Sequence, residues 1–142
     1  MDGCVQPCHS TSPSHQRSCT YQLNPSRKPA EIFWRKTLNV KAYINRGVAY
    51  RILGQYERAI QDYDEAIGVD PQYEAAYNNR GMAYWRLGQH ERAIQDYDEA
   101  IRLNPQDADA YAGRGIAYRL IGKSIEAERD FAKAKELGIE AP

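Results

Sequence analysis

From Val40 onward, apolar residues recur at helical spacing and are interrupted by short polar breaks. A first pattern has apolar or small residues three and four apart, which lie on one face of a helix: Tyr43, Gly47, Tyr50 and Leu53. After a break at Gly54, a second pattern follows: Ala59, Ile60, Tyr63, Ala66 and Ile67. It ends before Pro71, because proline disfavours helical backbone in the preceding residue. These patterns predict two helices joined by a tight turn.

The same pair of helical patterns occurs three times. The segment ERAIQDYDEAI at residues 57–67 returns unchanged at residues 91–101, 34 residues later. Aligned at this period, the chain forms three blocks: 40–73, 74–107 and 108–141. A fixed period in this range indicates stacked units that cannot bury their apolar faces alone. Small residues such as Gly47 and Ala59 let two antiparallel helices approach closely, and the tyrosines fill the remaining space.

The spacing of these residues resembles the tetratricopeptide repeat, which is also a 34-residue helix-turn-helix unit. The first block carries the pattern at Tyr43, Gly47, Tyr50, Ala59, Tyr63, Ala66 and Pro71, and the second at Tyr77, Gly81, Tyr84, Ala93, Tyr97, Ala100 and Pro105. The third has Tyr111, Gly115, Tyr118, Ala127, Phe131 and Ala134, with Ile139 in place of the proline. The resemblance implies an all-α fold, a right-handed superhelical α-solenoid of three repeats. It also implies a module for protein–protein interaction.

The ends of the array differ from its middle. Residues 1–29 are rich in Ser, Thr, Pro, His and Gln, and we predict a disordered tail because they offer little apolar surface to bury. We expect a short helix over residues 30–39, begun by Pro29, to cover the first repeat of the domain at 40–141. At the other end, isoleucines of the first two blocks become Glu128 and Lys135, which predicts that no further repeat stacks there. Drift of the third repeat is the alternative.

The resemblance implies that the first helix of each pair lines a concave groove. The residues off the packing seam are then candidates for peptide binding: Ile44, Asn45, Val48, Arg51, Asn78, Asn79, Met82, Trp85, Ile116 and Arg119. Met82 and Trp85 are the expected anchors, although both could instead pack between repeats. Asn45 and Asn79 suit pairing with a peptide backbone, and the alternative is a bond to nearby backbone of their own helix.

Two columns of charge run through the blocks. Arg46, Arg80 and Arg114 occupy one register position, and Asp62, Asp96 and Asp130 occupy another. A ligand site seldom repeats in every unit, so we predict a ladder of structural ion pairs. The remaining carboxylates of the second helices predict a solvated outer face, because side chains two positions apart on a helix do not face each other.

Some members of the resembled family clamp the terminal carboxylate of heat-shock chaperones with lysine, asparagine and arginine side chains. The corresponding positions here hold Ile44, Val48, Asn79, Asp109 and Gly113, of which only Asn79 matches. Without the basic residues, a peptide carboxylate would lose its charge-assisted bonds and meet Asp109. We therefore do not expect binding of chaperone tails.

Other chemistry finds little support in the sequence. The repeats contain no cysteine, no paired nucleophile and base, and no glycine-rich phosphate loop, so we expect neither enzymatic activity nor a cofactor. The formal net charge is zero and the repeats are net acidic, which disfavours nucleic acid as a partner. The tail holds metal-capable residues whose spacing is atypical of zinc sites: Cys4, Cys8, His9, His15 and Cys19.

The sequence therefore predicts a non-enzymatic adaptor that binds a peptide segment of another protein. A structural or oligomerisation module of a larger assembly is the alternative, and metal binding by the tail is a weaker one. Since no apolar run approaches the roughly 20 residues of a membrane helix and the N-terminus lacks a secretory core, we expect a cytoplasmic protein with no membrane partner. Weak homo-oligomerisation remains open.

Overall fold

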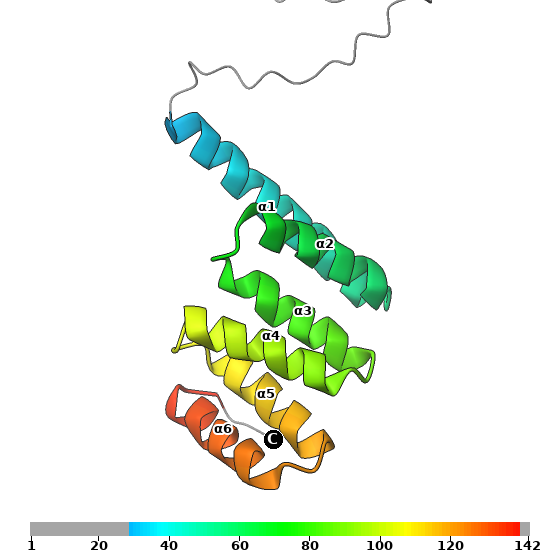
Figure 1. The fold of residues 1–142 in the computed structure, drawn as a ribbon, viewed down its shortest axis with the longest axis vertical. Helices are drawn as coiled ribbons and strands as arrows, with labels where there is room; N and C mark the ends of the chain where they lie inside the picture. The colour runs from blue at the N-terminus through cyan, green and yellow to red at the C-terminus, as the bar shows by residue number, and fades with distance from the viewer. Residues whose placement is uncertain (1–28, 140–142) are drawn as a thin grey trace, which may run out of the picture.

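The computed structural model describes the backbone of residues 29–139 and the side chains of residues 37–139. Within this range the chain forms six α-helices and no strand: α1 (Pro29–Ile52), α2 (Tyr56–Val69), α3 (Glu74–Arg86), α4 (His90–Leu103), α5 (Ala108–Leu120) and α6 (Ser124–Glu136). Successive helices pair as α1/α2, α3/α4 and α5/α6, and the pairs stack along the long axis of the molecule (Figure 1). The predicted all-α solenoid of helix pairs is confirmed.

The N-terminal helix differs from the prediction. The short helix expected over residues 30–39 is not a separate element, because α1 runs without a break from Pro29 to Ile52. Its N-terminal part extends past the end of α2 (Figure 1). Leu38, one of the residues expected to cover the first repeat, is 65% exposed. No helix-breaking residue separates the segment from the repeat, so the helix continues. The predicted disordered tail, apart from Pro29, lies outside the described residues.

Glycine ends the first helix of each pair. Gly54, Gly88 and Gly122 have φ angles of 74°, 74° and 82°, in the left-handed region that other residues rarely adopt. The residue after the glycine forms a hydrogen bond back to the end of the helix. In the first pair, the backbone N–H of Gln55 donates to the Tyr50 carbonyl at 2.9 Å. This is the hydrogen-bond pattern of a glycine-terminated helix. The turn fixes the antiparallel direction of the second helix.

Each helix pair is closed by an aromatic ring lying against a glycine. A Cβ atom added to Gly47 would lie 2.6 Å from Tyr63 Cε1, and one added to Gly115 would lie 2.7 Å from Phe131 Cε1. At Gly81 the corresponding distance, to Tyr97 Cε1, is 3.2 Å. The rings are almost fully buried, with Tyr63 0% exposed. Only glycine permits this approach in the first pair and the third.

Alanine substitutions at these glycines should therefore differ in effect. Gly47→Ala gains about 1 kcal/mol of helix propensity but overpacks the Tyr63 ring, which typically costs about 1–3 kcal/mol. We expect a net loss of up to about 2 kcal/mol in the free energy of unfolding, measured by urea denaturation. Gly81→Ala is the matched control, and we expect it to be neutral or stabilising because the contact there is looser. Equal effects at both positions would contradict this packing.

The predicted arginine–aspartate ladder is present. Arg80 Nε and Nη2 donate to the two carboxylate oxygens of Asp96 at 2.9 and 2.7 Å, and the pairs Arg46–Asp62 and Arg114–Asp130 have the same two-bond geometry. The aspartates are buried, each at most 5% exposed. Such forked pairing fixes geometry more strongly than a single bond. The ladder ties the first helix of every pair to the second.

The ladder also links successive pairs, which the sequence analysis did not predict. Arg80 Nη1 donates to Asp64 of α2 at 2.6 Å, and Arg114 Nη1 donates to Asp98 of α4 at 2.7 Å. Asp64 and Asp98 were expected to be solvated only. Each of these arginines therefore holds three helices together through two carboxylates.

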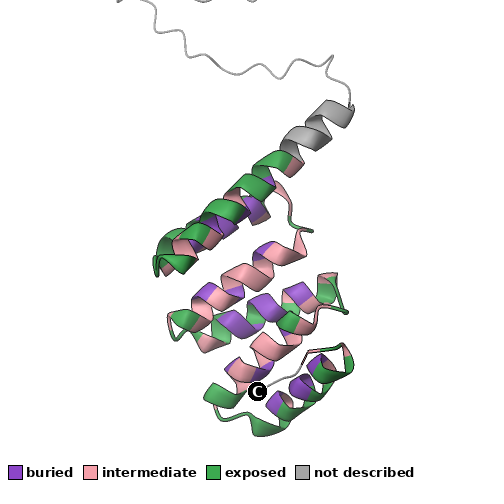
Figure 2. Ribbon diagram, turned by 180° about the vertical axis from the view of Figure 1, so that it is seen from behind, coloured by how far each residue is buried: buried purple, intermediate pink, exposed green. Residues whose placement is uncertain are grey.

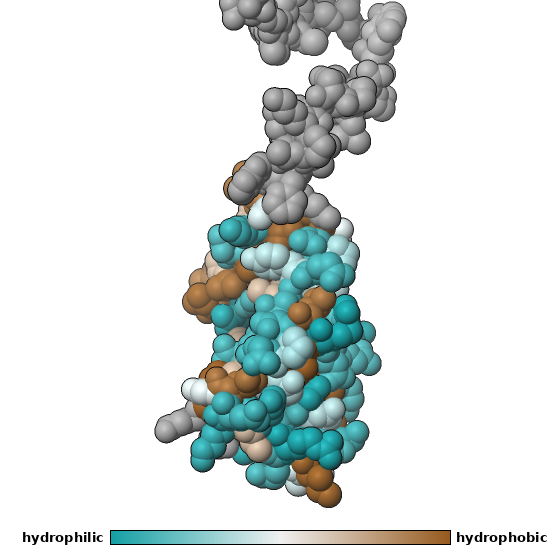
Figure 3. Space-filling view, turned by 90° about the vertical axis from the view of Figure 1, so that its left-hand side faces the viewer, coloured by the Kyte–Doolittle hydropathy of each residue, from teal (hydrophilic) through white to brown (hydrophobic). Residues whose placement is uncertain are grey.

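Exposure is uneven along the stack. The outer faces of α1 and α6 are largely exposed, whereas α3 and α4 are mostly buried or half-buried (Figure 2). Glu128 and Lys135 of α6 are exposed, as their charges require. On the face shown in Figure 3, apolar side chains form separate groups in a mostly hydrophilic surface. None of the helices between residues 29 and 139 is both long and apolar enough to cross a membrane.

Candidate functional site

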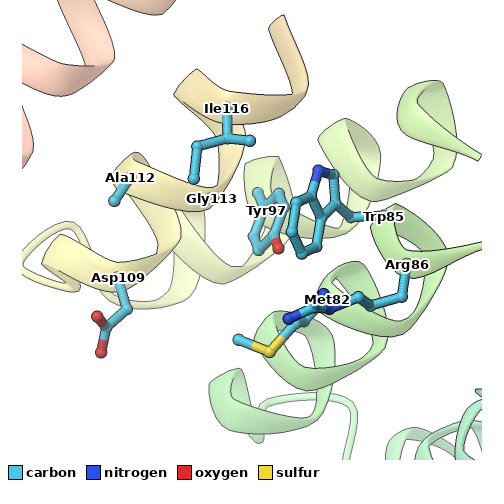
Figure 4. Close-up of a pocket in the computed structure, with 8 residues that line it drawn as sticks. All are labelled: Met82, Trp85, Arg86, Tyr97, Asp109, Ala112, Gly113 and Ile116. Carbon is cyan, nitrogen blue, oxygen red and sulfur yellow. The ribbon is translucent and has the colours of Figure 1, made fainter. Parts of the chain in front are cut away.

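A pocket of about 240 Å³ opens between α3 and α5. Its walls are mainly apolar, and Figure 4 shows side chains from both helices directed toward the same space. The lining residues are Met82, Trp85, Arg86, Tyr97, Asp109, Ala112, Gly113 and Ile116. The volume lies below the roughly 300–1,000 Å³ typical of small-molecule sites. It therefore suits one or two side chains of a bound chain better than a cofactor.

The pocket exists because Gly113 has no side chain. A Cβ atom at this position would lie 2.5 Å from Cζ of Tyr97, whose ring comes from α4 and is 2% exposed. In the preceding repeat the equivalent position is Asn79, which carries a side chain that Gly113 lacks. The absence of a side chain at Gly113 leaves the aromatic ring of Tyr97 as the floor of the pocket (Figure 4).

Three of the predicted groove residues meet in this pocket. Met82 and Trp85 lie one helical turn apart on α3, and Ile116 faces them from α5 (Figure 4). All three are half-buried. Trp85 also packs against the core cluster around Tyr97. It therefore contributes to packing between repeats and also lines the pocket. Its indole Nε1 has no hydrogen-bond partner within residues 37–139.

Ile44, a predicted groove residue, lies in the core. Its side chain is 9% exposed and belongs to the core cluster that joins α1 to Ala76 and Ala83 of α3. This register position faces the next repeat, so an aliphatic side chain there is buried by stacking. Val48 is half-buried and packs against the same cluster. Of the two apolar groove candidates of the first repeat, Ile44 is therefore buried and Val48 is half-buried.

The asparagines differ in their surroundings. Asn79 Nδ2 donates to the Ala75 carbonyl at 2.8 Å, which is the local backbone bond that the sequence left open as an alternative. Asn78 Nδ2 donates to Asp107 Oδ2 of the next repeat at 2.9 Å, while its Oδ1 has no partner within the described side chains. Asn45 is exposed. Asn78 and Asn79 are thus partly engaged within the protein.

The two arginines predicted for the groove do not line the pocket. Arg119 is exposed, and its guanidinium lies 5.1 Å from the centroid of the Phe131 ring. Arg51 is half-buried near Tyr63. The arginine at the pocket is Arg86, whose guanidinium lies 4.6 Å from the centroid of the Trp85 ring, a cation–π distance.

A carboxylate pair lies at the N-terminal ends of α3 and α5. Burial raises the pKa of the Glu74 carboxyl to about 7, and a hydrogen bond to Asp107 and repulsion from Asp107 and Asp109 act in the same direction. Asp107 also caps α5 by accepting from the Asp109 N–H at 3.0 Å. This end of the groove is therefore acidic, and its charge changes near neutral pH.

Replacing Glu74 with glutamine should stabilise the protein at alkaline pH. Because the pKa of Glu74 is raised in the folded state, the unfolded chain binds fewer protons between about pH 4.5 and 7, and stability falls as the pH rises through that interval. At pH 8 we expect Glu74→Gln to have a free energy of unfolding about 1 kcal/mol higher than the wild type, after discounting for solvent screening, and therefore a higher melting temperature. The difference should vanish near pH 4. A difference independent of pH in thermal unfolding would contradict this assignment.

The structure contains no candidate metal centre in the part of the chain that it describes: no three His, Cys, Asp or Glu side chains there are grouped to hold an ion. The weak metal candidates of the tail, Cys4 to Cys19, lie outside the described residues.

Sequence reasoning missed Tyr97 as a residue that lines the pocket. It was assigned to the packing seam, where it does lie, but the same ring also lines the pocket next to Gly113. The signal was the change from Asn79 to Gly113 at one register position.

Comparison with known proteins agrees with this architecture. Sequence models of the tetratricopeptide repeat, or TPR repeat, match residues 47–88, 74–107 and 96–129. A comparison with curated proteins gave no match.

Several solved structures are similar to the chain. The second TPR domain of human RPAP3, in complex with the HSP70 peptide SGPTIEEVD, is 33% identical with a TM-score of 0.70, over 72% of this chain and 86% of that one. The first TPR of Spaghetti (RPAP3), bound to the HSP90 peptide SRMEEVD, is 31% identical with a TM-score of 0.70, over 71% and 80%. The TPR domain of Arabidopsis OM64 is 27% identical with a TM-score of 0.71, over 72% and 85%. The three sequence matches, the three helix pairs and these similarities show that the chain belongs to the tetratricopeptide repeat family.

Proposed function

We propose that this protein is a non-enzymatic adaptor that holds an extended segment of a partner protein in the groove along α1, α3 and α5. An apolar side chain of that segment enters the pocket between α3 and α5. The observation that carries the proposal is the convergence of Met82, Trp85 and Ile116 over the space left by Gly113. Tryptophan is a frequent energetic centre of interfaces, and methionine adapts its shape to different partners.

The charges around the pocket favour a particular kind of segment. Asp109 lies at one side of the pocket and Arg86 at the other (Figure 4). The acidic pair of Glu74 and Asp107 lies close enough to Asp109 for their charges to interact, at the N-terminal ends of α3 and α5. An apolar anchor with a basic residue on the Asp109 side would place opposite charges together.

Free polar atoms at the groove support peptide binding. Trp85 Nε1 and Asn78 Oδ1 are a donor and an acceptor without partners among the described side chains. Buried groups of this kind usually find a partner, and small rotations of these side chains would let a peptide backbone supply one. We expect an affinity on the order of micromolar, because three repeats offer a standard-size interface or a smaller one.

The test is peptide selection followed by a groove variant. Random peptides would be selected on the full chain by phage display, and labelled peptides titrated by fluorescence polarisation. Trp85→Arg is the informative variant, because the first and third repeats already carry Arg51 and Arg119 at this position. We expect it to weaken binding at least tenfold, about 1.4 kcal/mol, with little change in melting temperature.

Ile125→Arg is the matched control, since Ile125 of α6 is 77% exposed and lies outside the pocket. It should leave the affinity unchanged. If Trp85→Arg binds the selected peptides as well as the wild type, the pocket is not the peptide site. If Trp85→Arg weakens binding and also lowers the melting temperature substantially, Trp85 belongs to the core and the loss of binding reflects unfolding.

Binding of the chaperone peptides is tested in a separate experiment. The solved neighbours hold HSP90 and HSP70 peptides, so these comparisons do not support the expectation that chaperone tails are not bound. Titration of SRMEEVD and of its C-terminally amidated form decides the matter. Saturable binding that amidation abolishes would identify a carboxylate clamp that Asp109 and Gly113 do not account for.

A further inference from the structure

One face of α1 is exposed in the described part of the chain, although Arg46 on this face reaches Asp62 of α2. We call it the outer stripe: Asn39, Ala42, Arg46 and Ala49, with Leu53 just beyond the helix end. These residues are spaced by three and four, so they share one side of the helix. All five are exposed, and Leu53 is 69% exposed. Figure 2 shows exposed positions along this helix, in green, where its side chains are described.

The equivalent positions in the other repeats are buried. Ala76 and Ala83 of α3 and Ala110 and Ala117 of α5 are 0% exposed, whereas Ala42 and Ala49, at the same register, are exposed. The alanines of α3 are covered by the second helix of the preceding pair, since Ile60 and Ile67 of α2 pack against the cluster containing them. The outer stripe thus has the composition of a helix-packing surface, with small residues that permit close approach.

Arg46 has an unused donor at the centre of the stripe. Arg80 and Arg114 each bind a carboxylate of their own pair and one from the preceding pair. Arg46 binds only Asp62, and no carboxylate within residues 37–139 meets its Nη1. Its side chain is 60% exposed, against 20% and 19% for the other two. Beside it, a depression of about 260 Å³ is lined by Asn39, Ala42, Tyr43 and Arg46.

We propose that the outer stripe is a docking site for an amphipathic helix of a partner protein, with an aspartate between two aliphatic residues. The pattern is that of α2, where Ile60, Asp64 and Ile67 face α3. The aspartate of the partner helix binds Arg46, and the aliphatic residues cover Ala42 and Ala49. The geometry of the Arg80–Asp64 contact supplies the template, with a donor–acceptor distance of 2.6 Å.

The end of a second copy does not fit this site. The last helix, α6, carries Glu128, Ala132 and Lys135 where α2 has Ile60, Asp64 and Ile67. Head-to-tail stacking would place two charges against Ala42 and Ala49 and would offer Arg46 no aspartate at the matching position. Two outer stripes facing each other would bring two arginines together instead of an arginine and a carboxylate.

The probe is a labelled peptide of residues 56–69, YERAIQDYDEAIGV. Because isolated helices of this length are marginal in water, a hydrocarbon bridge would replace Gln61 and Glu65, both exposed in α2. We expect saturable binding to the full chain by fluorescence polarisation. A peptide carrying Asp64→Asn should bind at least fivefold more weakly, since it loses the charge on which Arg46 acts.

Variants of the full chain locate the site. Ala49→Glu should weaken peptide binding at least tenfold without lowering the melting temperature, because Ala49 is exposed. Ala132→Glu, an exposed alanine of α6, is the control and should bind as the wild type does. The Trp85→Arg protein should bind the helical probe as the wild type does. This experiment therefore tests the outer stripe independently of the peptide groove.

Equal binding of the probe by the Ala49→Glu protein would overturn the proposal. So would sedimentation showing that the full chain dimerises and that Ala49→Glu abolishes the dimer, because the stripe would then belong to a second copy.

Discussion

Replacing Tyr97 with alanine should remove about 3–5 kcal/mol from the free energy of unfolding, the usual cost of truncating a buried aromatic ring. Tyr97 is 2% exposed, and its ring lies against both Gly81 of α3 and Gly113 of α5. A cavity at this position would therefore loosen the second pair and its contact with the third. Since a domain of this size is stable by about 5–15 kcal/mol, the loss is a large share of the total.

Tyr97→Phe is the control for this experiment. The third repeat already has Phe131 at the equivalent position, so the ring alone is sufficient for the packing there. We expect Tyr97→Phe to remain within about 1 kcal/mol of the wild type in urea denaturation followed by circular dichroism. A loss below 1 kcal/mol for the alanine variant would show that the ring is not central to the stack.

Replacing Arg80 with methionine should cost a similar amount, about 3–5 kcal/mol, because it leaves a buried carboxylate without its cation. Asp96 has a side chain only 8% exposed, and burial already raises its pKa while Arg80 opposes the rise. Without Arg80 the pKa of Asp96 rises further above its unfolded value. The unfolded chain then binds fewer protons than the folded one at neutral pH, so the deficit should shrink on acidification.

Two further variants separate the charge from the packing. The double variant Arg80→Met, Asp96→Leu should recover most of the stability, since a well-packed apolar pair can replace a buried ion pair. Arg46→Met should cost less than Arg80→Met, because the side chain of Arg46 is 60% exposed and it bridges one pair only. The measurement is urea denaturation at pH 7 and pH 5. A pH-independent deficit for Arg80→Met would contradict the role of Asp96.

The periodic part of the fold could be predicted from the sequence, because each helix repeats its own packing rule. The spacing of Tyr43, Gly47 and Tyr63 defined the helix pair, and the structure confirms the contact between Gly47 and Tyr63. The same regularity predicted the pairing of Arg80 with Asp96. The glycine and the arginine–aspartate pair occur in all three repeats, and they make the same packing contact or ion pair in each repeat.

The open positions were harder to predict, because one register position has different neighbours along the array. Ile44 is buried by α3, Asn78 binds Asp107, and Ala112 lines the pocket, although all three share a position. The unbroken course of α1 through residues 30–39 was also not predicted, although the lack of Pro or Gly in that segment was the available signal. The links from Arg80 to Asp64 and from Arg114 to Asp98 span the same 16 residues as those within a pair, and this equal spacing was the available signal.

The central claim is that the space between α3 and α5 receives an apolar side chain of a partner peptide. The most direct measurement is two-dimensional NMR of the isotope-labelled full chain during titration with a peptide selected as described above. We predict that the largest shift changes fall on residues around the pocket, including Met82, the Trp85 indole N–H and Gly113. Changes concentrated instead on α2 and α6, with the Trp85 indole signal unmoved, would contradict the claim.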